Sequence, residues 1–228
     1  MYIIYITQYL LILIIFSGLV PNEMLAGQHI KHQALQTDKE ENSLSILSWN
    51  IKMYPPPYGW FYNSIEKAEN IIKTLKESSK YDVILFQEAF SYKIRNKIYN
   101  SLKDLYPHQI DIKDETNFYK MNSGLWVISS IPITLIDNIN FTELRHNDWL
   151  SSKGAYLYSV IKSQQEFYII NTHMQADYQT IYSDIRTSQY TEIQQKLILP
   201  NENSEIPLIL CGDLNISKPS QLNQMLEK

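Results

Sequence analysis

Polar side chains recur where apolar, strand-like runs of this sequence end. Asn50 closes one such run, Glu88 a second and His173 a third, and Asp213 with Asn215 closes a fourth. A carboxylate at the mouth of a buried strand is costly unless something pairs with it. Carboxylate and amide oxygens are also the ligands that a hard cation such as Mg²⁺ takes in proteins. The pattern therefore predicts one metal-dependent site formed by these five residues.

Each of the five residues also has a plainer interpretation when it is taken alone. An Asp or Asn at a strand end is more often a turn or cap residue, and a lone histidine more often serves the structure. The recurrence of such residues at several strand ends is what favours a site.

Six runs have the composition of strands, and several are almost continuously apolar, as expected for strands buried on both faces. These runs are Leu44–Ile51, Asp82–Glu88, Leu125–Ser129, Tyr156–Lys162, Phe167–His173 and Pro207–Asp213. Three stretches between them have apolar residues at helical spacing instead. Their apolar positions are Ile65, Ala68, Ile71, Ile72 and Leu75; Ile94, Ile98, Leu102 and Leu105; and Ile185, Ile193 and Leu197. The alternation of strands and helices predicts an α/β domain.

Local signals mark the ends of the helical stretches. Asn63, with Glu66 three residues later, resembles a capping box and predicts the start of the first helix. Pro107 and Pro200 follow the second and third stretches and are expected to end them.

Composition narrows the class of protein. The 228 residues suit one sizeable domain. A content of 44% hydrophobic and 19% charged residues argues against overall disorder. The net charge of −4 shows no basic excess of the kind that nucleic-acid binding usually needs, so no nucleic-acid partner is expected. The single cysteine, Cys211, excludes an internal disulfide and is interpreted as a small core residue.

The amino terminus differs in composition from the rest of the chain. Residues 2–20 carry no charge, and Leu10–Phe16 is unbrokenly apolar. We interpret residues 1–26 as a signal peptide or a retained membrane anchor, with a plausible cut at Ala26-Gly27, and residues 27–43 as a polar linker. An ordinary buried segment is the alternative for the apolar run. The domain at 44–228 is therefore expected to be secreted or membrane-anchored, outside the cytoplasm.

Four short motifs contain these strand-end residues: Trp49-Asn50, Gln87-Glu88, Asn171-Thr172-His173 and Gly212-Asp213-Leu214-Asn215. Their order resembles the order found in the endonuclease/exonuclease/phosphatase superfamily. Within this superfamily the chain most resembles the bacterial neutral sphingomyelinases, or sphingomyelinases C. The segments that carry this closer resemblance are Leu150–Gly154, Thr172–Ala176 and Arg186–Gln189.

The resemblance implies a fold and a set of roles. The fold would be a four-layer sandwich of two facing mixed β-sheets flanked by helices, as in DNase I. Glu88 would hold the essential divalent cation, Mg²⁺ or a similar ion, with Asn50 beside it. Asp213 and Asn215 would orient the nucleophile and the phosphate, and His173 would donate to or stabilise the phosphoryl oxygens.

The resemblance also implies a substrate. The chain is expected to hydrolyse sphingomyelin, or a related choline phospholipid of a membrane, to phosphocholine and ceramide. Lys153 is either near the phosphate or a surface lysine, and the surface interpretation is favoured. The alternatives to this function are a nuclease of the same superfamily and a non-catalytic lipid-binding remnant.

The chain departs from the family pattern after Asn215. The family has a further strand that ends in an Asp-His pair, whose histidine activates water, and an aromatic hairpin that enters membranes. No histidine follows His173 here, and Glu227 is the only carboxylate after Asp213. We therefore expect the domain to lack its last strands and its activity to be impaired.

An aromatic, proline-rich stretch follows closely on Asn50. It includes Tyr54, Tyr58, Trp60 and Phe61. Aromatic side chains are favoured at a lipid–water boundary, so these four could touch a membrane surface. Packing of the same rings onto their own domain is an equally good interpretation.

Overall fold

The computed structural model describes residues 2–6, 43–55, 63–78, 81–112, 120–177, 182–203 and 205–226. Its strands within these ranges are β1 (Tyr2–Ile6), β2 (Leu44–Asn50), β3 (Val83–Gln87), β4 (His108–Ile110), β5 (Trp126–Ser129), β6 (Ile133–Asn140), β7 (Gly154–Lys162), β8 (Gln165–His173) and β9 (Leu208–Asp213). Its α-helices are α2 (Ser64–Glu77), α3 (Tyr92–Leu102), α4 (Ser183–Ile193) and α5 (Pro219–Leu226). Short helical turns are η2 (His146–Leu150), η3 (Gln194–Ile198) and η4 (Leu199–Asn201).

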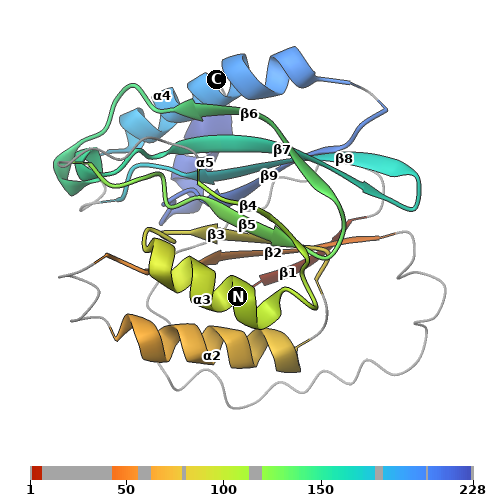
Figure 1. Ribbon diagram of the computed structural model, residues 1–228. Helices are drawn as coiled ribbons and strands as arrows, with labels where there is room; N and C mark the ends of the chain where they lie inside the picture. The colour runs from red at the N-terminus through yellow and green to blue at the C-terminus, as the bar shows by residue number, and fades with distance from the viewer. Residues whose placement is uncertain are drawn as a thin grey trace.

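The strands form two mixed sheets that face each other. The first sheet has the order β1-β2-β3-β5-β4, and the second has the order β6-β7-β8-β9. Helices α2 and α3 lie on the outer side of the first sheet, and α4 lies on the outer side of the second (Figure 1). The predicted four-layer sandwich is confirmed.

Three apolar clusters hold these layers together, and strand alternation distributes residues among them. Along β3, Val83 and Leu85 point into the cluster between the sheets, whereas Ile84 and Phe86 pack toward α2 and α3. In β9, Cys211 lies in the cluster between the sheets. Because both faces of these strands are covered, their sequences are apolar throughout rather than alternating.

The predicted elements correspond closely to the observed ones. The six predicted strands match β2, β3, β5, β7, β8 and β9, and the three helical stretches match α2, α3 and α4. Three further strands and α5 were not anticipated. Strand β6 carries exposed positions along its length and a bulge between Leu135 and Asp137, so its sequence lacks the apolar run of a buried strand.

The predicted helix boundaries hold only approximately. The capping box is wrong in its chemistry, although α2 does begin at Ser64. Asn63 has a left-handed backbone, with φ 48° and ψ 43°, and its side chain makes no capping hydrogen bond. A capping box needs an extended N-cap residue whose side chain reaches the first turn. Helix α3 already ends at Leu102, before Pro107, and Pro200 lies inside the turn η4 instead of beyond the helical segment.

Of the predicted leader, residues 1–26, the structure describes only residues 2–6. Tyr2–Ile6 forms β1, antiparallel to β2. The rest of the predicted leader and residues 27–42 of the predicted linker lie outside the described residues, so both stay predictions. Within the described part of the chain, no helix has the length and apolar character needed to cross a membrane.

Candidate active site

The parallel strand pairs bring the predicted residues to one edge of the sandwich. Asn50 ends β2 and pairs with Gln87, so Glu88 follows at the same edge of the first sheet. His173 ends β8 and pairs with Asp213 at the end of β9 in the second sheet. The five predicted residues, Asn50, Glu88, His173, Asp213 and Asn215, all line one cleft of about 520 Å³.

Two buried carboxylates face each other across this cleft and share one amide. The Asn50 Nδ2 group donates to Glu88 Oε1 at 2.7 Å and to Asp213 Oδ2 at 2.9 Å. Glu88 is 8% exposed and Asp213 is 3% exposed. Asn50 Oδ1 accepts from the Lys52 backbone N–H. As it stands, Asn50 therefore bridges the carboxylates instead of presenting its oxygen to a cation.

The carboxylates are suited to a divalent cation. Glu88 Oε2 is buried and has no hydrogen-bond partner among the described residues. One potential ligand atom each from Glu88, His173 and Asp213 lies within 4.8 Å of the others. Two buried anions so close together repel each other unless a cation compensates them. The oxygen donors fit Mg²⁺, which prefers such ligands.

The backbone is strained at several residues of the cleft. Lys52, Glu88 and Asn215 have φ values of 50, 53 and 52 degrees. These values lie in the left-handed region, which side chains other than Asn and Asp rarely enter. Gly212 also has a positive φ, and a Cβ there would clash with the Thr172 carbonyl oxygen. Such conformations persist where the surrounding structure holds them, and they concentrate at functional sites.

Asp213 and Asn215 form a rigid unit at the end of β9. The Asn215 backbone N–H donates to Asp213 Oδ1 at 3.0 Å, and Asn215 Nδ2 donates to the Met174 carbonyl at 2.9 Å. The Met174 backbone N–H donates to the Asp213 carbonyl at 2.9 Å. The segments that follow β8 and β9 are thereby tied to each other.

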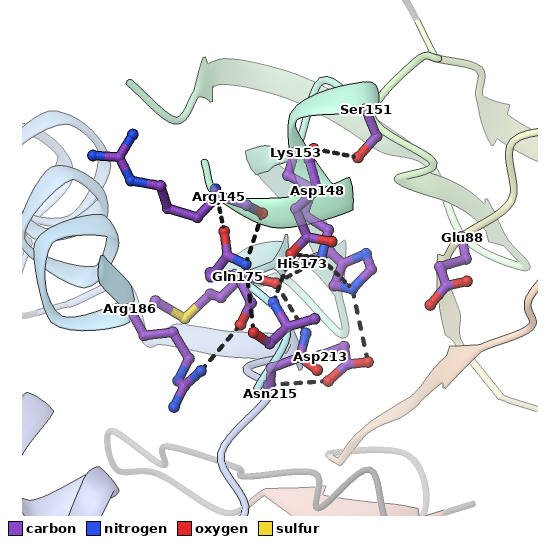
Figure 2. Close-up of polar contacts among 12 residues, drawn as sticks. Glu88, Arg145, Asp148, Ser151, Lys153, His173, Gln175, Arg186, Asp213 and Asn215 are labelled. Atoms are coloured by element: carbon purple, nitrogen blue, oxygen red, sulfur yellow. Dashed lines mark hydrogen bonds and ion pairs between the residues drawn. The ribbon is translucent and has the colours of Figure 1, made fainter. Parts of the chain in front are cut away.

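Lys153 is part of the site, and the favoured interpretation of it as a surface lysine is wrong. It is 3% exposed. Its Nζ donates to Asp148 Oδ2 at 2.9 Å and to the Met174 carbonyl at 2.9 Å, and it lies 3.0 Å from His173 Nε2. Three partners, one of them a carboxylate, compensate the buried charge. Figure 2 shows Lys153 and Asp148 beside the His173 ring, with Glu88 facing them from across the site.

His173 is held neutral by its surroundings. Burial is the main cause that lowers its pKa well below the usual value of 6.5, and the positive charges of Lys153 and Lys52 lower the pKa further. An ammonium group can only donate, so Nε2 accepts from Lys153 and the proton of the neutral ring lies on Nδ1. Nδ1 is buried and has no partner among the described residues.

A fully buried amide pair joins the two sheets beneath the cleft. Gln87 Nε2 donates to Asn171 Oδ1 at 2.7 Å, and Asn171 Nδ2 donates to the Phe86 carbonyl at 3.2 Å. Gln87 immediately precedes Glu88, and Asn171 lies two residues before His173. This contact fixes how the two halves of the site face each other.

The aromatic stretch is only partly described. Tyr54 lines the cleft and stacks on Phe90, with ring centroids 5.7 Å apart. Tyr58, Trp60 and Phe61 lie outside the described residues, so membrane contact by the stretch stays a prediction.

Sequence reasoning missed two charged residues of the cleft. Asp148 is 7% exposed and pairs with Lys153, and Lys52 is an exposed cation on the lining. Neither interrupts a long apolar run, which is the signal that revealed the strand-end residues.

Two facing mixed sheets, with carboxylates, amides and a histidine gathered at their strand ends, define the class of this chain. The model of the Endonuclease/Exonuclease/phosphatase family matches residues 47–227. The chain belongs to this family.

The more specific resemblance to bacterial sphingomyelinases is also confirmed. The chain is 26% identical over 209 residues to sphingomyelinase C of Listeria ivanovii, which covers 85% of this chain and 62% of that protein. A solved sphingomyelinase C from Streptomyces griseocarneus superposes with a TM-score of 0.71 at 21% identity, over 81% of this chain and 68% of that one. A beta toxin from Staphylococcus aureus, solved with bound magnesium ions, gives a TM-score of 0.70 at 21% identity, over 80% of this chain and 68% of that one. The chain spans less than two thirds of the length of the Listeria protein.

Proposed function

We propose that this chain is a Mg²⁺-dependent phosphodiesterase domain that hydrolyses sphingomyelin, or a related choline phospholipid, to phosphocholine and ceramide. The observation that carries the proposal is the meeting of two buried carboxylates, Glu88 and Asp213, across a cleft that also holds His173 and Lys153. The Listeria relative named sphingomyelinase C supports the choice of substrate.

Glu88 and Asp213 are the residues that we propose to hold the cation, with Asn50 setting their separation. The unpartnered Glu88 Oε2 is the atom most in need of a positive partner. When bound, Mg²⁺ polarises a phosphoryl group and lowers the pKa of water.

The second sheet supplies the groups proposed to act on the phosphate. Asp213 and Asn215 orient the nucleophile and the phosphate, because the loop that carries them is fixed by its hydrogen bonds to Met174. His173 stabilises the phosphoryl oxygens together with Lys153, whose buried positive charge lies beside the ring.

Turnover of the 228-residue chain is expected to be low. Among the described residues that line the cleft, His173 is the only histidine, and its Nε2 is engaged by Lys153. A positioned general base is worth about 10²–10⁴ in rate. With His173 engaged in this way, the described lining of the cleft offers no other histidine for the role of general base.

The proposed substrate also implies a place of action. Sphingomyelin is a membrane lipid, so the mouth of the cleft must reach a bilayer surface. We propose that the chain acts outside the cytoplasm, in keeping with the apolar run near its amino terminus, and that Tyr54 and the three aromatic residues after it approach the membrane.

A substrate comparison tests the proposal. The chain would be incubated with sphingomyelin liposomes, phosphatidylcholine liposomes or plasmid DNA, in Mg²⁺ or EDTA, with the Glu88→Gln variant alongside. We expect phosphocholine release from sphingomyelin that EDTA and Glu88→Gln abolish, and intact DNA.

Two other results would replace the proposal. DNA cleavage with intact sphingomyelin would identify a nuclease. Liposome binding without phosphocholine release, equal in the chain and in Glu88→Gln, would identify a non-catalytic lipid-binding module.

A further inference from the structure

One wall of the cleft is formed by a segment with little regular structure. Residues 143–150, called here the wall segment, consist of a short irregular stretch and the single turn η2. Asn147, Asp148 and Leu150 of this segment line the cleft. Trp149 is 56% exposed, so the burial of its largest side chain does little to fix the segment.

Gln175 holds the wall segment from a position just after β8. Its Oε1 accepts from the Arg145 backbone N–H at 2.8 Å, and its Nε2 donates to the Arg145 carbonyl at 3.1 Å. One fully buried side chain thus satisfies both backbone polar groups of a single wall residue. Figure 2 shows the Gln175 amide turned toward Arg145.

Gln189 of α4 extends the same contact. Its Oε1 accepts from the Gln175 backbone N–H at 2.9 Å, and its Nε2 donates to the Glu143 carbonyl at 2.9 Å. Gln189 is also fully buried. The two glutamines therefore connect α4, the end of β8 and the wall segment through four amide hydrogen bonds.

The wall segment in turn places a charged group of the site. Asp148 Oδ2 accepts from the Ala176 backbone N–H at 2.6 Å and from Lys153 Nζ at 2.9 Å. Lys153 Nζ lies 3.0 Å from His173 Nε2. A shift of the wall segment would move Asp148 and release Lys153 from its place beside His173.

We propose that Gln175 and Gln189 are positioning residues for the active site. Their paired amides fix the wall segment, and through Asp148 they hold Lys153 against His173. The consequence for turnover rests on the proposed function, whereas the placement of Lys153 does not. Neither glutamine lines the cleft, so they act through other residues.

The reactivity of the lysine amines tests this placement directly. The full chain and its variants would be labelled with trace acetic anhydride, and the rate at each lysine would be read by peptide mass mapping. Lys153 has a side chain only 4% exposed, whereas Lys162, ion-paired to Asp82 elsewhere in the molecule, serves as the internal reference.

Gln189→Leu removes both of its hydrogen bonds with little change of volume and leaves the buried Gln175 N–H and the partly buried Glu143 carbonyl unpaired. We expect Lys153 to be labelled about 10-fold faster or more, with Lys162 unchanged. The proposal is overturned if the labelling rate of Lys153 does not rise in Gln189→Leu, or if the labelling rate of Lys162 rises in parallel with it.

Gln195→Leu is the matched control. Gln195 is an exposed glutamine in the π-helical turn η3, which directly continues α4. Its replacement makes the same chemical change on a neighbouring turn without touching the wall segment. The labelling rate of Lys153 should therefore stay as low as in the unaltered chain. Equal acceleration of Lys153 in both leucine variants would also overturn the proposal.

A second variant covers the case in which Gln189→Leu does not fold. Gln189→Glu keeps the acceptor for the Gln175 N–H and loses only the donor to Glu143. We expect Lys153 to be labelled faster than in the unaltered chain and more slowly than in Gln175→Leu, which removes both bonds to Arg145. Labelling of Lys153 at the unaltered rate in both variants would show that the glutamines do not position it.

Turnover supplies the functional test. In Gln189→Leu, kcat should fall by about 10-fold or more. The Mg²⁺ concentration for half-maximal activity should stay the same, because Glu88 lies on the other sheet and Asp213 is bonded to Asn50 and to the Met174 N–H, not to the wall segment. A fall in kcat accompanied by an equally large rise in the Mg²⁺ concentration for half-maximal activity would overturn the positioning role. If the unaltered chain shows no phosphodiesterase activity, the proposed function fails, and the labelling contrast still decides the placement of Lys153.

Discussion

The two sheets contribute to the candidate site in different ways. On the side from the first sheet, Glu88 is sparsely bonded: its Oε1 accepts from Asn50, and its Oε2 is buried without a partner among the described residues. The side from the second sheet is densely bonded, with Lys153 donating to both Asp148 and the Met174 carbonyl. One side carries uncompensated negative charge, and the other carries a positive charge that is well paired.

This difference indicates a division of labour. An unsatisfied carboxylate oxygen is costly in the protein alone and becomes favourable when a cation binds. A well-bonded lysine beside a neutral histidine costs little reorganisation when a phosphoryl group arrives. Glu88 of the first sheet, facing Asp213 at the end of β9, is therefore suited to bind the cation, and Lys153 and His173 of the second sheet are suited to hold the phosphate.

The largest effect is expected on the first-sheet side. Glu88→Gln keeps the shape and removes the charge. Mg²⁺ affinity should fall by more than about 100-fold, because the loss of an outer partner alone costs about 10–100-fold. Turnover should fall to background. Calorimetric Mg²⁺ titration checks this, with the exposed Glu66→Gln as control. Unchanged affinity and turnover would refute the assignment of the metal site.

On the second-sheet side, His173→Ala should impair chemistry and leave cation binding intact. We expect kcat to fall by about 10²–10⁴, the usual contribution of a positioned acid–base group. Mg²⁺ affinity should change little, because the charges of Glu88 and Asp213 remain. His108→Ala on β4 is the control. A variant that loses folding and cation binding together would instead assign His173 a structural role.

The two lysines of the cleft allow a matched stability test. Lys153→Met leaves the buried Asp148 carboxylate without its cationic partner. Breaking a buried pair in this way costs about 3–5 kcal/mol. Lys52→Met removes an exposed cation and should change the free energy of unfolding by less than about 0.5 kcal/mol. Urea unfolding of both variants checks this. Equal effects would show that the two sides of the cleft are not bonded differently.

The sequence predicted those parts of the site where a polar residue interrupts an apolar pattern. Glu88, His173 and Asp213 stand at the ends of strands covered on both faces. Parallel pairing brings the ends of β8 and β9 together, and the facing of the two sheets places Glu88 opposite them. The two-sheet fold followed from the same runs and from the family resemblance. Strand β6 was not predicted, because its exposed positions and its bulge interrupt the pattern of apolar residues that marks a buried strand.

Other parts could not be predicted because they depend on partners distant in the chain. The burial of Lys153 requires two partners about 20 residues later in the chain: His173, which ends β8, and the carbonyl of Met174, which follows it. Gln175 and Gln189 belong to the segments that resemble the family, yet a neutral amide acquires its role only from the groups it meets. The left-handed backbone of Asn63 is set by the path of the chain into α2, which residue type alone does not specify.

The smallest expected effect concerns pH and again separates the two sides. Burial, Lys153 and Lys52 lower the pKa of His173 in the folded protein well below 6.5, whereas the unfolded chain titrates near about 6.5. Below that pH the unfolded state binds more protons, so stability falls as the pH drops toward the folded-state pKa. The contribution of His173 is fully present above the unfolded pKa, and it can amount to at most about 1.4 kcal/mol for each pH unit of this window.

Urea unfolding in EDTA, at several pH values between about 7.5 and about 5, measures this dependence. The unaltered chain should lose stability as the pH falls across this range, and His173→Asn should flatten the dependence because it removes the titrating group. Lys52→Met should flatten it slightly, since its charge is the least of the three causes. If His173→Asn and the unaltered chain show the same slope, His173 is not held neutral by the second-sheet network, and the contrast between the two sides would rest on the cation site alone.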